Sequence, residues 1–285
     1  MIGCAVGDAL GAGSGKFYGR WTDDTHMMIG VAESLIANKG FNGEHMAQTF
    51  IRNYELEPWR GYASGPPLVF KWIKAGVPWN EAAKKLFGGT GSYGNGAAMR
   101  VAPVGLLYYD DFEKLRIVAY AQSIITHAHE LGVEGAVLQA FAVALALKED
   151  PSGGLDVNTF IERLMNLTTN PVYRGKLEAA LSLLNKKPDK HEVIEKLGNS
   201  VEAHNSVPTA IYCFLQNHTS FEGAVASAVS LGGDRDTIAA MTGAISGAYH
   251  GVKAIPERWL NKLEKKTYIE KLAEDLYKLK IQSHP

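Results

Sequence analysis

Apolar residues recur along the chain at the three- and four-residue spacing of amphipathic α-helices. One stripe follows Thr25, a second precedes Pro151, and a third lies near the C-terminus. Their members are Met27, Met28, Val31, Leu35 and Ile36; Leu138, Phe141, Ala142, Leu145 and Ala146; and Leu263, Tyr268, Leu272, Leu276 and Leu279. Alternating strand patterns joined by a hairpin turn are missing from the sequence. The pattern predicts an all-α protein of about a dozen helices.

Clusters of Gly and Pro separate the predicted helices. They stand at 38–40, 65–67, 88–91, 151–154 and 187–188. No segment between them is long enough to act as a linker, so we expect a single domain over residues 1–285. The run Gly243-Ala244-Ile245-Ser246-Gly247-Ala248 is a small-residue surface, which favours close approach of two helices.

Composition narrows the class of protein. The 285 residues are 46% hydrophobic and 21% charged, with a formal net charge of −1. This balance excludes a disordered chain, and it disfavours nucleic-acid or membrane binding through bulk charge. Cys4 and Cys213 lack metal-binding spacing and indicate a reducing compartment. A signal peptide and an apolar run of transmembrane length are both missing from the pattern, so we expect a soluble, cytoplasmic protein.

Two acidic segments each stand directly before a predicted helix. They are Trp21-Thr22-Asp23-Asp24-Thr25 and Gly232-Gly233-Asp234-Arg235-Asp236-Thr237. Each could simply cap its helix, because acids and hydroxyls at that position are favourable. Together they offer four carboxylates with flanking hydroxyls, which are the oxygen ligands that Mg²⁺ prefers. If the fold brings them together, cations between them would relieve their repulsion.

A third segment is rich in glycine: Phe87-Gly88-Gly89-Thr90-Gly91-Ser92-Tyr93-Gly94-Asn95-Gly96. Glycine-rich backbone at a helix entrance can direct N–H groups toward phosphate oxygens, and the two aromatic rings could stack on a base. The alternative is an ordinary loop. His127 is a weaker candidate, because a histidine at the end of an apolar helix is more often structural.

Four motifs together resemble the ADP-ribosylglycohydrolase family. They are Gly-Asp-Ala-Leu-Gly at 7–11, Trp-Thr-Asp-Asp-Thr at 21–25, Gly-Asn-Gly-Ala-Ala-Met-Arg at 94–100, and Gly-Gly-Asp-Arg-Asp-Thr at 232–237. Further segments are similar to the animal ADP-ribosylhydrolase 3 branch, at 91–95, 126–128, 138–140, 197–199 and 206–215. J1-crystallins also belong to the wider family.

The resemblance implies a fold and a site. The fold would be an orthogonal helical bundle with two Mg²⁺ ions in a cleft. One ion would be held by Thr22, Asp23, Asp24 and Asp236, and the other by Asp234, Asp236 and Thr237. Phe87 and Tyr93 would sandwich adenine, the segment Gly91, Ser92, Tyr93, Gly94 and Asn95 would wrap the diphosphate and ribose, and His127 would touch the distal part of the ligand.

The implied reaction is hydrolysis at C1″ of ADP-ribose, releasing it from serine or from poly(ADP-ribose). The segment Ser206-Val207-Pro208-Thr209-Ala210-Ile211-Tyr212 favours this branch over hydrolysis of ADP-ribosyl-arginine. The implied partners are ADP-ribose or an ADP-ribosylated protein, bound by a monomer in the cytoplasm, nucleus or mitochondria.

The chain departs from the branch in two places. Enzymes of this branch carry an acidic loop with a catalytic Glu between the Gly-Asp and Thr-Asp-Asp motifs, whereas residues 9–22 contain no carboxylate. Three interpretations stay open: another residue substitutes, with Asp236 and Asp23 favoured, a segment was lost, or the protein is an ADP-ribose-binding or crystallin-like relative that does not cleave. The second departure is Arg235, which we expect to point away from the metals.

Overall fold

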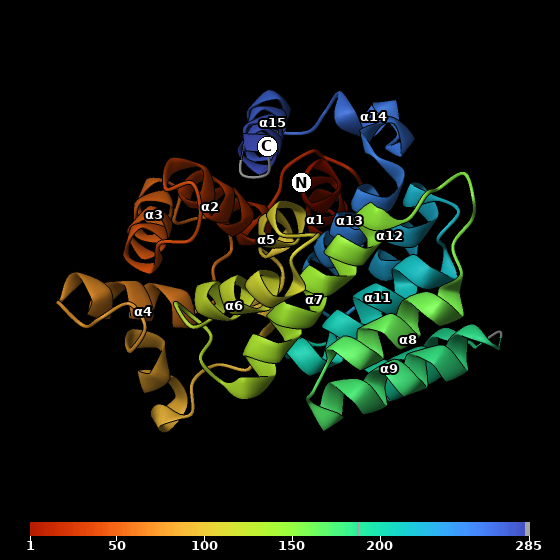
Figure 1. The fold of residues 1–285 in the computed structure, drawn as a ribbon, viewed down its shortest axis with the longest axis horizontal. Helices are drawn as coiled ribbons and strands as arrows, with labels where there is room; N and C mark the ends of the chain where they lie inside the picture. The colour runs from red at the N-terminus through yellow and green to blue at the C-terminus, as the bar shows by residue number, and fades with distance from the viewer. Residues whose placement is uncertain (187, 283–285) are drawn as a thin grey trace.

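The computed structural model describes residues 1–186 and 188–282, and every regular element within these ranges is a helix (Figure 1). The all-α prediction is therefore confirmed for this part of the chain. The predicted break at 187–188 lies partly outside it. The α-helices are α1 Ile2–Ala12, α2 Asp23–Ala37, α3 Gly43–Leu56, α4 Gly65–Lys74, α5 Ala102–Leu107, α6 Phe112–Ser123, α7 Glu130–Lys148, α8 Val157–Leu167, α9 Pro171–Leu184, α10 Lys190–Leu197, α11 Val207–Gln216, α12 Phe221–Ser230, α13 Arg235–His250, α14 Glu257–Leu260 and α15 Lys266–Gln282.

Short 3₁₀ helices occupy four connections, at η1 Ala82–Gly89, η2 Asn95–Ala97, η3 Ala203–Asn205 and η4 Val252–Ala254. The buried apolar side chains of the described residues form one cluster, which is the packing that a single domain requires.

Helix α7 crosses the middle of the molecule (Figure 1) and packs against α5, α6, α11 and α13. Its predicted stripe from Leu138 to Ala146 is buried. By length and composition alone α7 could cross a membrane, but 78% of that apolar window is buried inside the fold. The core helix of a soluble protein has the same properties, so this helix is weak evidence for a membrane span.

Helices α1 and α13 make the most extensive contact in the fold, through small residues on both sides. A Cβ added to Gly7 would lie 2.0 Å from the carbonyl oxygen of Ala239, and one added to Gly3 would lie 2.2 Å from that of Gly243. Since real Cβ atoms do not approach so closely, only glycine permits this distance between the helix axes. The small-residue run beginning at Gly243 therefore packs as predicted.

Two local predictions were wrong. Gly65-Pro66-Pro67 begins α4 instead of separating helices, because proline in the first turn has no N–H that the helix needs. Tyr268 does not belong to the buried C-terminal stripe: it is 41% exposed, and its hydroxyl donates to Glu33. Leu263 is buried but precedes α15.

Candidate functional site

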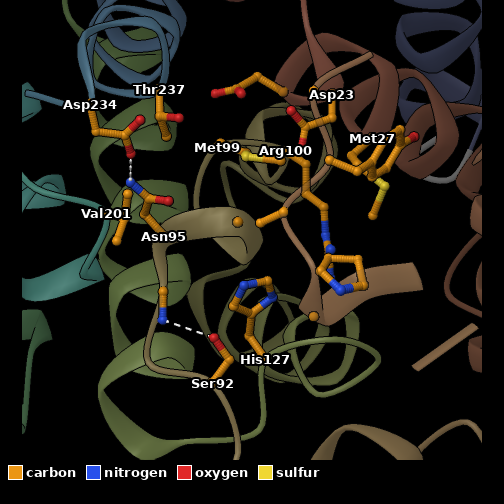
Figure 2. A pocket seen from close by; sticks show the side chains of 18 of the residues that line it. Asp23, Met27, Ser92, Asn95, Met99, Arg100, His127, Val201, Asp234 and Thr237 are labelled. Atoms are coloured by element: carbon orange, nitrogen blue, oxygen red, sulfur yellow. Dashed lines mark hydrogen bonds between the residues drawn. The ribbon is translucent and has the colours of Figure 1, made fainter. Parts of the chain in front are cut away.

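A pocket of about 340 Å³ opens between the acidic segments and the glycine-rich segment (Figure 2). Asp23 lies on one wall, and Asp234 and Thr237 lie on the opposite wall. Asp24, next to Asp23 in sequence, and Asp236, between Asp234 and Thr237, also line the pocket. The remaining surface comes from residues 61–66, from parts of the segment 87–100, and from Met27, His127 and Val201. The two acidic motifs, far apart in sequence, thus face one space.

The first acidic wall is the N-terminus of α2. Thr22 caps this helix, because its hydroxyl oxygen accepts from the backbone N–H of Asp24. The same hydroxyl lies 2.9 Å from Oδ1 of Asp8 and 3.0 Å from Oδ2 of Asp24. A hydroxyl has one proton and can donate to only one of these carboxylates at a time. The capping alternative is therefore confirmed for Thr22, but it leaves the neighbouring acids incompletely satisfied.

The second acidic wall is the N-terminus of α13. Asp234 occupies the capping position without a side-chain capping bond, and its Oδ2 instead accepts from Nδ2 of Asn95 at 2.6 Å (Figure 2). The preceding turn depends on Gly233, which has a φ of 62° and would place a Cβ 1.9 Å from the carbonyl oxygen of Asn199. The backbone N–H of Asp234 donates to that same carbonyl.

Helix α1 connects the two walls. Asp8 accepts hydrogen bonds from the backbone N–H groups and hydroxyls of Thr22 and Thr25, which fixes the start of α2. One turn later, Gly11 lies so close to α13 that an added Cβ would be 2.4 Å from Cα of Asp236. The spacing between the two acidic walls is therefore set by α1.

Burial raises the pKa values of the acids in this cluster. The pKa of Asp23 rises to about 7, and that of Asp234 to about 6, chiefly because both are desolvated and secondarily because of neighbouring carboxylates. The pKa of Asp24 is raised well above its ordinary value for the same reasons. Burial also raises the pKa of Asp8 to about 6, although hydrogen bonds from Thr25 and Thr22 oppose the rise.

Oxygen donors and an unpartnered carboxylate oxygen make this cluster suitable for a hard cation. Oδ1 of Asp24 is buried and has no hydrogen-bond partner. Among residues 1–186 and 188–282, however, no three His, Cys, Asp or Glu side chains are close enough to hold an ion as they stand. Threonine hydroxyls and water fit the remaining positions, because Mg²⁺ usually retains several waters and binds few carboxylates. The donor chemistry therefore fits the metal that the resemblance implies.

The glycine-rich segment is held against two neighbours. The carbonyl of Ser92 accepts from the N–H of His129 at the start of α7, and the N–H of Asn95 donates to the carbonyl of Val201. Gly94 forms an isolated bridge with Glu202. The segment leads into the three-residue η2 and not into a long helix, so the expected helix-entrance geometry is not observed.

Most predicted ligand-binding residues line the pocket. Phe87, Ser92, Gly94, Asn95 and His127 do so. Phe87 is 65% exposed, in a left-handed backbone conformation with a φ of 51°.

Three predicted residues lie behind or beside the pocket surface instead: Thr22, Gly91 and Tyr93. The ring of Tyr93 contacts His129 and His204. Ser206 and Thr209, which stood out in sequence, make hydrogen bonds to neighbouring backbone carbonyls.

Both departures from the branch are visible in the structure. Residues 9–22 contribute nothing to the pocket lining, whose carboxylates come from the four aspartates alone. Arg235 is also not part of the lining, and the described residues include no ion pair between it and the acids. The expected orientation of Arg235, away from the metals, stays a prediction.

Sequence reasoning missed several residues of the site. Asp8 and Arg100 both lie inside the quoted motifs, but their sequence positions gave no indication of their contacts. Tyr62 and its neighbours at 61–64 had no signal, and Gly65 and Pro66 were predicted only to separate helices. Their place in the pocket depends on a backbone contact, in which the N–H of Asp23 donates to the carbonyl of Arg60 at 2.8 Å.

Comparisons with known proteins agree with this geometry. The sequence matches a family model described as ADP-ribosylglycohydrolase over residues 1–285. ADP-ribosylhydrolase ARH3 of Homo sapiens is 36% identical, over 91% of this chain and 78% of the human protein. ADP-ribosylarginine hydrolase Tri1 of Pseudomonas putida is 24% identical, over 97% of this chain and 76% of that protein. A solved structure described as an ADP-ribosylglycohydrolase-related protein complex has a TM-score of 0.77 and 28% identity, covering 98% of this chain and 95% of that one. The predicted fold class and the resemblance are thereby confirmed.

Proposed function

Because the chain belongs to the ADP-ribosylglycohydrolase family, we propose that it is a Mg²⁺-dependent hydrolase that releases ADP-ribose from serine-ADP-ribosylated proteins or from poly(ADP-ribose). The glycohydrolase class itself follows from the family and from the ARH3 relatives. The observation that carries the finer proposal is the pocket in which four aspartates face each other beside the glycine-rich segment. The higher identity to ARH3 than to the arginine hydrolase Tri1 supports the choice of substrate.

In this proposal the four aspartates and two threonines hold two ions. Thr22, Asp23 and Asp24 contribute from α2, and Asp234, Asp236 and Thr237 contribute from α13. When bound, Mg²⁺ supplies positive charge that orients ribose hydroxyls and favours ionisation of a water. The raised pKa values of Asp23 and Asp234 are consistent with such a role, because burial, and secondarily repulsion from neighbouring carboxylates, disfavours their charged forms without a cation.

The chain's own residues bind and orient the substrate. Phe87 presents an exposed ring for adenine, and the backbone of Ser92 and Gly94 faces the space for the diphosphate. In the reaction, an oxygen of water bonds to C1″ while the bond from C1″ to the serine oxygen breaks, and the serine oxygen takes the proton that the water gives up. Asp23 and Asp236 are the carboxylates that we propose accept the proton of water.

A second candidate function follows from one specific observation. The segment between α1 and α2 provides no carboxylate, and the acids that line the pocket are already engaged as proposed ligands. A protein with the nucleotide pocket but without an acid for the leaving group would bind ADP-ribose and turn over slowly. An ADP-ribose-binding or crystallin-like role is therefore the alternative.

One assay distinguishes the two functions. Protein is incubated with a serine-ADP-ribosylated peptide, with Mg²⁺ or with EDTA, and free ADP-ribose is measured. We expect release that requires Mg²⁺. Binding of ADP-ribose at micromolar concentration without release would overturn the hydrolase and favour a binding protein. The absence of both would favour a structural role. A parallel arginine-ADP-ribosylated peptide tests the substrate, since faster release from it would contradict the serine assignment.

A further inference from the structure

Arg100 is a buried cation at the floor of the pocket whose hydrogen-bond acceptors are all neutral. The side chain is fully buried and lies over the ring of Phe50. Its Nε and Nη2 donate to Oε1 and to the carbonyl of Gln122, and its Nη1 donates to Oγ1 of Thr126, each at 2.7 Å. A buried charge normally requires a specific arrangement of partners, so these three contacts place the guanidinium firmly.

The contact with Thr126 continues to a histidine. Oγ1 of Thr126, also fully buried, lies 2.8 Å from Nδ1 of His127. Arg100 can only donate, so the threonine oxygen is the acceptor in that bond. The single hydroxyl proton is then free for Nδ1. If Nδ1 carried a proton instead, the hydroxyl of Thr126 would be a buried donor without an acceptor, which folded proteins rarely tolerate.

The other ring nitrogen of His127 faces the glycine-rich segment. A Cβ added to Gly96 would lie 2.9 Å from Nε2, and one added to Gly94 would lie 3.5 Å from it. His127 also lines the pocket (Figure 2). Burial, and to a lesser degree the charge of Arg100, lowers the pKa of His127 to about 3, so the ring is neutral near pH 7.

We propose that Arg100 and Thr126 are positioning residues that hold His127 in the tautomer with its proton on Nε2, so that this histidine can only donate a hydrogen bond to the ligand. The subsite beside Ser92 and Gly94 then selects an acceptor oxygen, such as that of a phosphate or a ribose hydroxyl, and rejects a donor. The identity of the ligand as ADP-ribose rests on the proposed function, but the tautomer does not.

The same network holds the segment that the ligand would contact. Nε2 of Gln122 donates to the carbonyl of Ala97 in η2, while Oε1 of Gln122 accepts from Arg100. The backbone of His127 is fixed as well, because its N–H donates to the carbonyl of Ser123 and its carbonyl accepts from Oγ of Ser123. Arg100 therefore fixes both the histidine and the glycine-rich backbone above it.

The test is ¹⁵N NMR of histidine-labelled, ligand-free protein, with His127 assigned by the missing signal of His127→Gln. We expect the wild-type ring to be protonated on Nε2 alone. Thr126→Ser keeps the hydroxyl and should keep this signature, whereas the isosteric Thr126→Val should show a mixture of tautomers. Protonation on Nδ1 in the wild type, or an unchanged tautomer in Thr126→Val, would overturn the proposal. The wild-type spectrum decides the tautomer even if a variant fails to fold.

Binding measurements separate this proposal from the proposed function. By calorimetry, Thr126→Val should bind ADP-ribose about tenfold more weakly than wild type, with Thr126→Ser close to wild type. Equal affinities for all three proteins would overturn the donor role of His127. If wild-type protein showed the Nε2 tautomer but bound no ADP-ribose, the proposed function would fail while the positioning assignment stood.

Discussion

Asp24 is a residue whose folded environment opposes its own charge. It is fully buried, one of its oxygens has no hydrogen-bond partner, and the hydroxyl nearest its other oxygen is shared with Asp8. A carboxylate in that situation is stabilised by gaining either a proton or a cation. The protonation state of the cluster and its occupancy by metal are therefore coupled.

This coupling predicts how the stability of metal-free protein depends on pH. The pKa values of Asp23, Asp234 and Asp8 are raised in the folded state to between about 6 and about 7. A group with a raised folded-state pKa contributes stability at low pH and loses it as pH rises through that value. In EDTA, we expect the contribution of this cluster to decrease between about pH 4 and about pH 7, from the ordinary carboxyl pKa to the raised folded-state values, and Mg²⁺ to restore stability at pH 8.

Thermal unfolding at several pH values, with EDTA or Mg²⁺, measures the effect. Asp24→Asn removes one repelling charge and should flatten the pH dependence in EDTA. Asp150→Asn, in the exposed turn after α7, serves as the control and should leave it unchanged. A wild-type curve with the same slope in EDTA and in Mg²⁺ would contradict the coupling.

Among single residues, the acids of the site could be predicted because two carboxylates within a few residues form a local sequence pattern. The role of Arg100 could not, because it depends on the side chains that surround the guanidinium in the fold. Complete burial and contacts with Gln122 and Thr126 arise from packing between residues more than twenty positions apart. The sequence supplies the charge of a residue but not its solvation.

Among the helices, α1 contacts the starts of both α2 and α13, which carry the acids of the site. It has no charged residue except Asp8, and Gly3, Gly7 and Gly11 lie directly against the backbone of α13. The sequence predicted the small-residue surface on α13 and could not identify its partner. Similarly, the glycine-rich segment was expected to open a helix that could bind phosphate, but it leads into the short η2. The reason is that residues 92–95 pair with residues 129 and 201–202.

Two glycine substitutions should have opposite effects on stability, because only one of these glycines lies in the contact between α1 and α13. Gly7→Ala would bring Cβ to 2.0 Å from a backbone oxygen of α13, and we expect it to destabilise the protein by about 1–3 kcal/mol or more through overpacking. Gly175→Ala, within α9, meets nothing within 4 Å and should stabilise by about 0.5–1 kcal/mol through helix propensity.

Urea denaturation of both variants provides the comparison. A Gly7→Ala protein as stable as wild type would show that the two helices can separate without cost, which would contradict the argument that glycine sets the spacing of the acidic walls. A shift in Mg²⁺ affinity is expected only for Gly7→Ala.

On the scale of the whole molecule, Arg60 joins distant parts of the chain at the edge of the site. Its guanidinium donates to the carbonyl of Trp21 and to both oxygens of Glu264, and it also pairs with Glu57. Its own carbonyl accepts from the N–H of Asp23. Arg60 therefore links the start of α2, through Trp21 and Asp23, to Glu57 and Glu264.

Arg60→Gln should destabilise the protein by roughly 2–3 kcal/mol, between the values typical of exposed and of buried ion pairs, because the Arg60 side chain is only 9% exposed. The matched control is Arg52→Gln: Arg52 pairs with Glu33 but is 56% exposed, and its replacement should change stability by no more than about 0.5 kcal/mol. Denaturant midpoints measure both. Equal losses of stability in the two variants would contradict the argument that Arg60 links these segments.

Features of the fold that depend on residues close in sequence could be predicted, and features that depend on residues far apart in sequence could not. Helical periodicity is local, and it predicted an all-α chain with buried stripes in α2 and α7. The meeting of Asp23 with Asp236 is not local. It followed only from the resemblance, because no periodic pattern records which helix ends adjoin.

The pairing of α1 with α13 also determines when the site can exist during synthesis. Helix α1 is apolar and small-sided, and α13, which completes its packing, is made more than 200 residues after it. Until then, the α2 acids have no opposing wall and the glycines of α1 have no partner. While the residues between α1 and α13 are being made, the nascent chain carries an apolar helix without its partner, which makes association with a chaperone advantageous. The pocket that both acidic segments line can therefore form only after α13 has been made.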